Sequence, residues 1–202
     1  MNNAEYADYA ILAIGGSAGS LDVICNVLEA LVAPTELAVV LCLHTGSRDV
    51  GDLCDVLSLH CALPVAEALD GETLAPNRVH VAGGGYHLLV ERAGTFALCA
   101  GERIQYVRPS IDVLFESMAE AYRRRLAGVL LSGANADGAV GLHAIHRLGG
   151  LTIVQNPDTA AAREMPESAL KLFTPDRQSS PSELVDAALD ISRLARCIEC
   201  RR

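Results

Sequence analysis

Aromatic residues are scarce in this 202-residue sequence, which has no tryptophan and in which Phe, Trp and Tyr together make up 4% of the chain. Half of the residues are nonetheless hydrophobic, so a core must be built from Ala, Leu, Val and Ile. The chain is long enough for one domain with a sizeable core and short for two. We therefore expect a single domain over residues 1–202, with its core from about 9 to about 172 and a C-terminal helix over about 181–198.

Long apolar runs are also missing from the sequence. No stretch approaches the roughly 20 consecutive apolar residues that a transmembrane helix needs. The first ten residues are polar and acidic, unlike a secretory signal. These absences predict a cytoplasmic protein that does not insert into a membrane.

Positive charge is in short supply as well. The formal net charge is −9, whereas a nucleic-acid surface needs clustered Lys and Arg to displace counterions. The basic run Arg123–Arg125 is short, and we interpret it as a solvated helix end, where cations suit the helix dipole. No nucleic-acid partner is predicted.

The cysteine pattern argues against disulfides, because the seven cysteines are odd in number and scattered through apolar segments. Cys25, Cys42 and Cys99 are expected to be small core residues. Cys197 and Cys200 form a C-x-x-C pair near the end of the chain, but without a second pair this is weak evidence for a metal site. We predict no metal and no cofactor.

What the sequence does have is an alternation of buried strands and helices. Continuous apolar runs at 9–14 and 37–44 are each followed by a segment with helical apolar spacing, at 21–31 and 50–59. The same alternation returns after residue 108. This pattern predicts an α/β fold with a doubly wound, mostly parallel sheet and helices on both faces.

The middle of the chain follows a different pattern. Between residues 64 and 100, short apolar stretches alternate with turn signals such as Asp70-Gly71 and Ala93-Gly94. We expect an antiparallel patch here, with a hairpin at Ala93-Gly94, attached to a corner of the parallel sheet.

Polar side chains follow three of the predicted parallel strands at the point where each strand ends. Ser17 follows the first, His44 follows the second, and Asp137 stands in the loop after the strand near 126–131. Parallel strands end on the same side of a sheet, where ligands bind. Serine needs an imidazole to take its proton, and the imidazole needs a carboxylate to orient it. The three residues are therefore a candidate nucleophilic triad.

The glycines around Ser17 add to this interpretation. Gly15 to Gly19 fits the G-x-S-x-G pattern of a sharp strand-to-helix turn, which exposes the hydroxyl and brings backbone N–H groups close to a developing oxyanion. The usual α/β-hydrolase order of Ser, Asp, His does not apply, because here the order is Ser17, His44, Asp137.

The same residues also fit less specific roles. A glycine-rich turn can bind a nucleotide phosphate, although this one lacks the Lys-Ser/Thr of a P-loop and does not fit G-x-G-x-x-G. His44 can be a strand-end histidine that only bonds backbone, and Asp137 can be only a helix cap.

Several longer segments narrow the choice. "AIGGSAGSLD", "RPSIDVLFESMAEAY", "GVLLSGANADGAVGL" and "QNPDTAAAREMPESAL" occur in this order. From about Tyr9 to about Leu172 the chain resembles the catalytic domain of chemotaxis protein-glutamate methylesterases of the CheB type. This family hydrolyses the γ-methyl ester of glutamates on chemoreceptor signalling helices, and many members also deamidate glutamine there. The resemblance implies that Ser17 is the nucleophile, His44 the base and Asp137 the orienting carboxylate.

The resemblance also implies roles for neighbouring residues and for a partner. Backbone donors for the oxyanion would be Ala18 and Ala134, Asn135 belongs to the same loop, and Met165 would lie near the site. The substrate would be the methylated cytoplasmic domain of a chemoreceptor. Because an acidic enzyme gains nothing from its net charge when it approaches an acidic helix bundle, any attraction must be local, with Arg103, Arg108 and Arg163 as candidates.

The sequence departs from the family pattern in two loops. Ala18 replaces a threonine, Ala134 a methionine and Asn135 a glycine. Asparagine tolerates a left-handed backbone better than most residues, so the loop is expected to keep its shape. These changes motivate an alternative, in which the protein is a catalytically impaired relative that binds a receptor or another partner.

Regulation is a third departure from the family. Family members commonly carry an N-terminal phospho-receiver domain, whereas here the first strand begins near Tyr9. The chain would be constitutively active, part of a longer protein, or regulated in trans by a response regulator or a methyltransferase.

Overall fold

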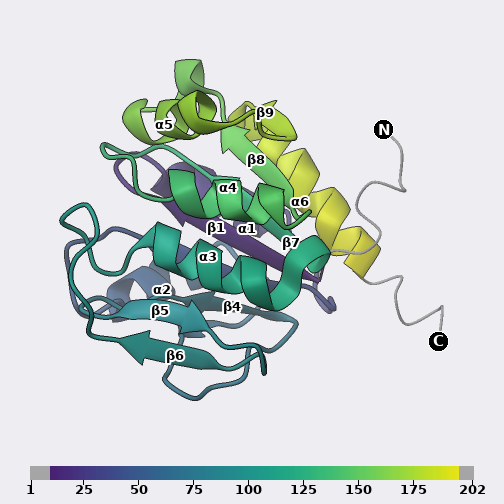
Figure 1. Cartoon of the computed structure of the whole chain (residues 1–202). Helices are drawn as coiled ribbons and strands as arrows, with labels where there is room; N and C mark the ends of the chain where they lie inside the picture. The colour runs from purple at the N-terminus through teal and green to yellow at the C-terminus, as the bar shows by residue number, and fades with distance from the viewer. Residues whose placement is uncertain (1–9, 196–202) are drawn as a thin grey trace.

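A parallel sheet of seven strands forms the centre of the computed structural model, which describes residues 10–195 (Figure 1). The strand order is β3-β4-β2-β1-β7-β8-β9, and every neighbouring pair in it is parallel. The strands are β1 (Ile11–Gly16), β2 (Ala38–Leu43), β3 (Val65–Glu67), β4 (Arg78–Val81), β7 (Leu126–Leu130), β8 (Leu151–Gln155) and β9 (Arg177–Ser179). With β1 in the middle, the chain builds the sheet outward in both directions.

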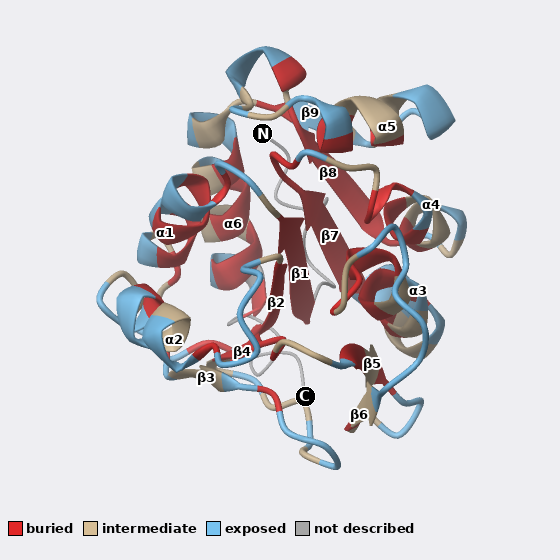
Figure 2. Ribbon diagram, turned by 90° about the vertical axis from the view of Figure 1, so that its left-hand side faces the viewer, coloured by how far each residue is buried: buried red, intermediate tan, exposed pale blue. Residues whose placement is uncertain are grey.

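Helices cover both faces of this sheet, as Figure 2 shows. They are α1 (Leu21–Glu29), α2 (Gly51–Ser58), α3 (Ile111–Tyr122), α4 (Ala139–Arg147), α5 (Glu164–Leu172) and α6 (Pro181–Ala195), with the short 3-10 helices η1 (Arg123–Arg125) and η2 (Pro157–Thr159). Alternate residues of the central strands belong to two separate cores. Leu12 and Ile14 pack with α1 and α6, whereas Ile11 and Ala13 pack with α3 and α4.

The antiparallel part is a hairpin of β5 (His87–Val90) and β6 (Phe96–Cys99), which packs on α3. The predicted turn at Ala93-Gly94 joins these two strands. The doubly wound, mostly parallel sheet with helices on both faces and an antiparallel hairpin is therefore confirmed.

The expectation for residues 64–100 was wrong in one respect. β3 and β4 do not belong to the antiparallel patch, because β4 pairs in parallel with β2 and β3 pairs in parallel with β4. The turn at Asp70-Gly71 lies in the connection between these two parallel strands. Strands this short carry too few residues for their pattern to reveal their pairing partner.

The cysteine prediction is confirmed for Cys25 and Cys42, which are buried, and wrong for Cys99, which is exposed. Cys99 is the last residue of β6, a strand with only one partner, whose burial decreases toward its end. The C-x-x-C pair and the predicted end of the last helix lie outside the described residues.

Two further features of the described chain bear on the sequence predictions. The basic run Arg123–Arg125 is exposed and directly follows α3, as predicted for a solvated helix end. Within residues 10–195, no helix has the length and apolar character needed to cross a membrane.

Candidate active site

The strand register brings Ser17 and His44 side by side. In the β1–β2 pair Gly16 is opposite Leu43, so the two polar residues come directly after paired strand ends. The N–H of His44 donates to the carbonyl oxygen of Gly16 at 3.2 Å, which continues the ladder by one step. The N–H of Ser17 donates in the other direction, to the carbonyl oxygen of Ser132 after β7, at 2.8 Å. Ser17 thus stands between the carboxyl ends of β2 and β7.

The chain turns sharply after Ser17 to enter α1. The carbonyl oxygen of Ser17 accepts hydrogen bonds from the N–H of Ser20 (3.1 Å) and from its hydroxyl (2.7 Å). Gly19 has a φ of +75°, and a side chain there would collide with Ala161, so the turn requires glycine at this position. Among the described residues, no hydrogen-bond partner occupies the Ser17 hydroxyl or the N–H of Ala18. Both groups are available to a ligand.

Asp137 is completely buried and accepts four hydrogen bonds. One comes from His44, whose Nε2 lies 2.9 Å from Oδ2. The other donors are the Ser110 hydroxyl (2.7 Å), the N–H of Ile111 (2.7 Å) and the N–H of Asp112 (3.2 Å). Burial alone would raise the pKa of Asp137, but the hydrogen bonds outweigh it and hold the pKa below the usual range for aspartate.

This arrangement fixes the tautomer of His44. An ionised Asp137 has no proton to donate, so Nε2 of His44 must carry the hydrogen between them. The neutral imidazole then has its lone pair on Nδ1. That atom is buried and has no hydrogen-bond partner in the described part of the chain. In this tautomer the accepting nitrogen of His44 is unused, as a general base requires.

Two serines that support this site were not predicted from the sequence. Ser110 caps α3 by accepting from the N–H of Val113, and its hydroxyl also donates to Asp137. Ser132 is completely buried, and its hydroxyl donates to the carbonyl oxygen of Ala18 (2.7 Å) and accepts from the N–H of Ala162 (2.8 Å). A serine directly after the β7 strand was the only available signal for it.

The loop before Asp137 keeps its shape in a different way from the one expected. Asn135 is not among the residues with positive φ. Its side-chain oxygen instead accepts from the N–H of Asp137 at 3.2 Å. The N–H of Ala136 donates to the side chain of Gln105 at 3.1 Å. Ala134 is exposed, and its N–H has no partner among the described residues.

Met165 lies beneath this loop. Its side chain is completely buried and fills the space in front of the α-carbon of Gly133. Its N–H donates to the carbonyl oxygen of Gly133 at 2.9 Å. The structure thus places Met165 where it supports the loop that carries Ala134.

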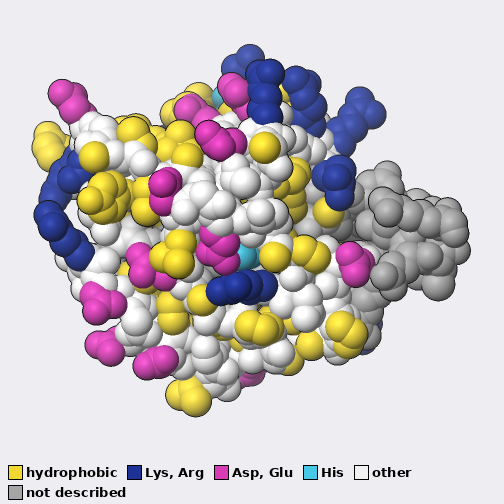
Figure 3. Space-filling model, turned by 90° about the horizontal axis from the view of Figure 1, so that it is seen from below, with side chains coloured by type: hydrophobic (Ala, Val, Ile, Leu, Met, Phe, Trp, Pro, Cys, Tyr) yellow, Lys and Arg dark blue, Asp and Glu magenta, His cyan; other side chains and the backbone are white. Residues whose placement is uncertain are grey.

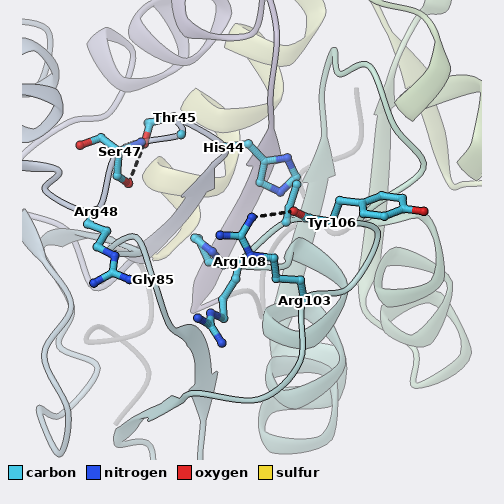
Figure 4. A pocket seen from close by; sticks show the side chains of 11 residues that line it. His44, Thr45, Ser47, Arg48, Gly85, Arg103, Tyr106 and Arg108 are labelled. Carbon is cyan, nitrogen blue, oxygen red and sulfur yellow. Dashed lines mark hydrogen bonds between the residues drawn. The ribbon is translucent and has the colours of Figure 1, made fainter.

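A pocket of about 220 Å³ opens beside His44 (Figure 4). Its walls come from the loop after β2 and from the loop between β6 and α3. Its charged lining residues are Arg48, Arg103 and Arg108. Within residues 10–195, no group of three or more His, Cys, Asp or Glu side chains could hold a metal ion.

A second buried carboxylate, Asp112, lies behind Asp137. Burial raises its pKa from 3.8 to about 7, and the nearby charge of Asp137 adds to this, although the N–H of Gly141 donates to it at 2.8 Å. Between pH 4 and 7 the folded protein therefore holds a proton that the unfolded chain has lost. The cost of ionising Asp112 in the fold reduces stability as the pH rises through this range.

We expect Asp112→Asn to remove this dependence. The free energy of unfolding of the variant, relative to the parent, should rise between pH 4 and pH 7 by at most about 4 kcal/mol, because each unit of pKa shift corresponds to about 1.4 kcal/mol. Urea unfolding at several pH values measures it. Glu120→Gln, an exposed carboxylate on the same helix, is the matched control. A difference that stays constant with pH would show that Asp112 is not the titrating group.

Comparisons with known proteins find similarity to one family over most of the chain. A family model described as CheB methylesterase matches residues 12–188. A putative protein-glutamate methylesterase/protein-glutamine glutaminase of Leptospira interrogans (serovar copenhageni) is 40% identical over 169 residues, which are 84% of this chain and 88% of that protein. The crystal structure of the Thermotoga maritima CheB methylesterase catalytic domain superposes with a TM-score of 0.82 at 27% identity, covering 89% of this chain and 98% of that one.

Other relatives are longer than this chain. The protein-glutamate methylesterase/protein-glutamine glutaminase 1 of Bordetella avium is 38% identical over 165 residues, which are 82% of this chain but 48% of that protein. The chain therefore spans about half the length of this relative.

Proposed function

Because this chain belongs to the CheB methylesterase family, we propose that it is a serine hydrolase that removes γ-methyl esters from glutamate residues of chemoreceptor signalling helices. The observation that carries the proposal is the buried 2.9 Å contact between His44 and Asp137 at the strand end next to Ser17. The printed names of its relatives include protein-glutamine glutaminase, so we also propose deamidation of glutamine at the same site.

The proposed reaction proceeds through an acyl-enzyme. Nδ1 of His44 takes the proton of Ser17 as its oxygen attacks the ester carbonyl, and Asp137 holds the resulting imidazolium through Nε2. The C–O bond to the methoxy group then breaks, and His44 returns the proton so that methanol leaves. Water, activated by the same nitrogen, hydrolyses the acyl-enzyme to glutamate and free Ser17. With glutamine, ammonia is the leaving group.

The oxyanion would be held by backbone donors. The N–H groups of Ala18 and Ala134 have no partner among the described residues. Ala18 belongs to the same turn as Ser17, and Ala134 belongs to the neighbouring loop after β7. The peptide that carries the N–H of Ala18 is held through its own carbonyl oxygen, that of Ser17, which accepts from the N–H and the hydroxyl of Ser20. A backbone donor does not depend on the side chain, so the replacement of a threonine by Ala18 leaves it in place.

The test combines covalent labelling with product analysis. A fluorophosphonate should label the folded protein, and mass spectrometry should place the label on the peptide that contains Ser17. The protein should also release methanol from a methylated chemoreceptor cytoplasmic fragment. If folded protein gives neither label nor methanol, the proposed activity is wrong, and binding to the same fragment would favour the alternative of a catalytically impaired binding module.

A further inference from the structure

Three arginines gather in the pocket beside His44, although the chain as a whole carries a net charge of −9. On the face shown in Figure 3, the Lys and Arg side chains stand in small groups among acidic ones. In Figure 4 the guanidinium of Arg103 extends to the side of the pocket where His44 stands, and Arg48 comes from the opposite wall, next to Gly85. The pocket is thus a local concentration of positive charge in an acidic protein.

None of these three arginines has a carboxylate within 4.0 Å among residues 10–195. Other arginines of the chain do have such partners. Arg78 lies 3.2 Å from a carboxylate oxygen of Glu72, and Arg163 lies 3.0 Å from one of Asp158. Of the arginines predicted to attract substrate, Arg163 is therefore already paired, whereas Arg48 was not predicted from the sequence.

The three arginines differ in how they are held. Arg108 donates to the carbonyl oxygens of Ala100 (2.9 Å) and Gly101 (2.6 Å), so it fixes its own loop. Its Nε is buried without a partner among the described residues. Arg103 makes only a long hydrogen bond, 3.4 Å, to the carbonyl oxygen of Tyr106. Arg48 makes no side-chain hydrogen bond with any described residue. Arg48 and Arg103 therefore have donors to offer.

The backbone around Arg48 is fixed as well. The N–H of Gly84 donates to the carbonyl oxygen of Arg48 at 3.1 Å. A side chain at Gly84 would collide with the carbonyl oxygen of Ser47, so the two loops can approach this closely only because residue 84 is glycine. Because the backbone of this part of the pocket is already ordered, it loses less conformational entropy when a ligand binds.

We propose that this pocket binds a carboxylate side chain of the protein substrate, one that neighbours the reacting ester on the same helix. The proposal rests on the proposed function. Arginine forks pair with carboxylates in two-point hydrogen bonds. Residues three or four apart on a helix are neighbours on its surface, so an ester held at Ser17 brings an acidic residue one turn away to the adjacent pocket. The pocket would thereby select esters in acidic surroundings.

The experiment compares two helical peptides, each with a single glutamate γ-methyl ester. They differ only in the residue that lies one helical turn away from this ester. One has glutamate there and the other methionine, which is similar in size and uncharged, and which the proposed deamidation cannot alter. Methanol release gives kcat/KM for the parent, for Arg48→Gln/Arg103→Gln and for the control Arg92→Gln, an exposed arginine of the β5–β6 turn outside the pocket. Melting temperatures check that each variant is folded.

We expect the parent to prefer the acidic peptide about ten-fold, since one charge-assisted hydrogen bond is worth about that factor. The double variant should reduce the preference to less than about two-fold, and Arg92→Gln should keep it. Arg48→Lys/Arg103→Lys should keep part of the preference for the acidic peptide. Lysine keeps the positive charge but cannot make the two-point hydrogen bond of a guanidinium group. Equal rates for both peptides in the parent, or an unchanged preference in the double variant, would overturn the proposal.

Two further measurements test the pocket apart from ester hydrolysis. In the first, glutamine replaces the ester in both peptides, and fluorescence anisotropy measures how tightly the unreactive Ser17→Ala protein binds them. The difference in affinity between the two peptides reports on the pocket even if no ester is hydrolysed. The pocket and the proposed activity can therefore fail independently. If millimolar inorganic phosphate raises the melting temperature of the parent but not of the double variant, and the acidic peptide binds no better than the neutral one, the pocket serves a free anion and our assignment is wrong.

Discussion

Ser17→Ala should reduce kcat for methanol release from a methylated receptor fragment by about four to six orders of magnitude. Removal of the nucleophile from a Ser-His-Asp triad leaves only substrate binding and oxyanion stabilisation, which retain roughly 10³–10⁴-fold of the rate enhancement. KM should change little, because the hydroxyl makes no contact that the described structure depends on. Labelling by a fluorophosphonate should disappear as well.

The matched control is Ser58→Ala, an exposed serine on α2 whose hydroxyl bonds only to the carbonyl oxygen of Cys54. It should keep both the activity and the labelling of the parent. If Ser17→Ala releases methanol as fast as the parent, Ser17 is not the nucleophile. A His44→Ala variant should lose about as much as Ser17→Ala, and the double variant should lose little more, because the residues act as one unit.

Asp137→Asn should impair both catalysis and stability. Four donors converge on the two carboxylate oxygens, so an amide nitrogen must face a donor in either orientation. If the nitrogen takes the place of Oδ2, it opposes the N–H of Ile111 and drives His44 into the tautomer with Nδ1 protonated. If it takes the place of Oδ1, His44 keeps its tautomer, but the negative charge that stabilises the imidazolium is gone.

We expect a loss in kcat of about 10³–10⁴-fold and a decrease in the free energy of unfolding of about 2–4 kcal/mol, since a buried donor is left unpaired. Enzyme assays and urea unfolding, followed by circular dichroism because the chain has no tryptophan, measure the two effects. Asp158→Asn is the control, since Asp158 is exposed and pairs only with Arg163 across the surface. A stable Asp137→Asn variant would show that the carboxylate does not hold the start of α3.

The sequence alone could predict the central part of the fold because strands buried on both faces read as continuous apolar runs. β1, β2, β7 and β8 are all of this kind. The rule that parallel strands end at one edge then predicted that Ser17, His44 and Asp137 lie together, and the contact between His44 and Asp137 is present in the structure. The pairing partners of β3 and β4 could not be predicted in the same way. These strands add to the sheet beside β2, and their own sequences do not show which edge of the sheet is free to pair with them.

Other features of the site depend on side-chain packing that no local pattern encodes. Ser132 and Ala162 are 30 residues apart, and their hydrogen bond exists only because two loops meet above β7. Met165 was expected near the site, and its complete burial against Gly133 depends on packing that the sequence does not show. Arg48 and Arg103 face the same pocket from loops that are separated by four strands in the chain.

The position of Asp137 at the start of α3 has a consequence for how this molecule loses activity. Asp137 bonds the imidazole of His44 and also accepts from the first amide groups of α3, so the proposed triad cannot form while that helix end is detached. Local unfolding of the first turn of α3 would therefore abolish activity while the sheet stays folded. In mild denaturant, activity should be lost at a lower denaturant concentration than β structure.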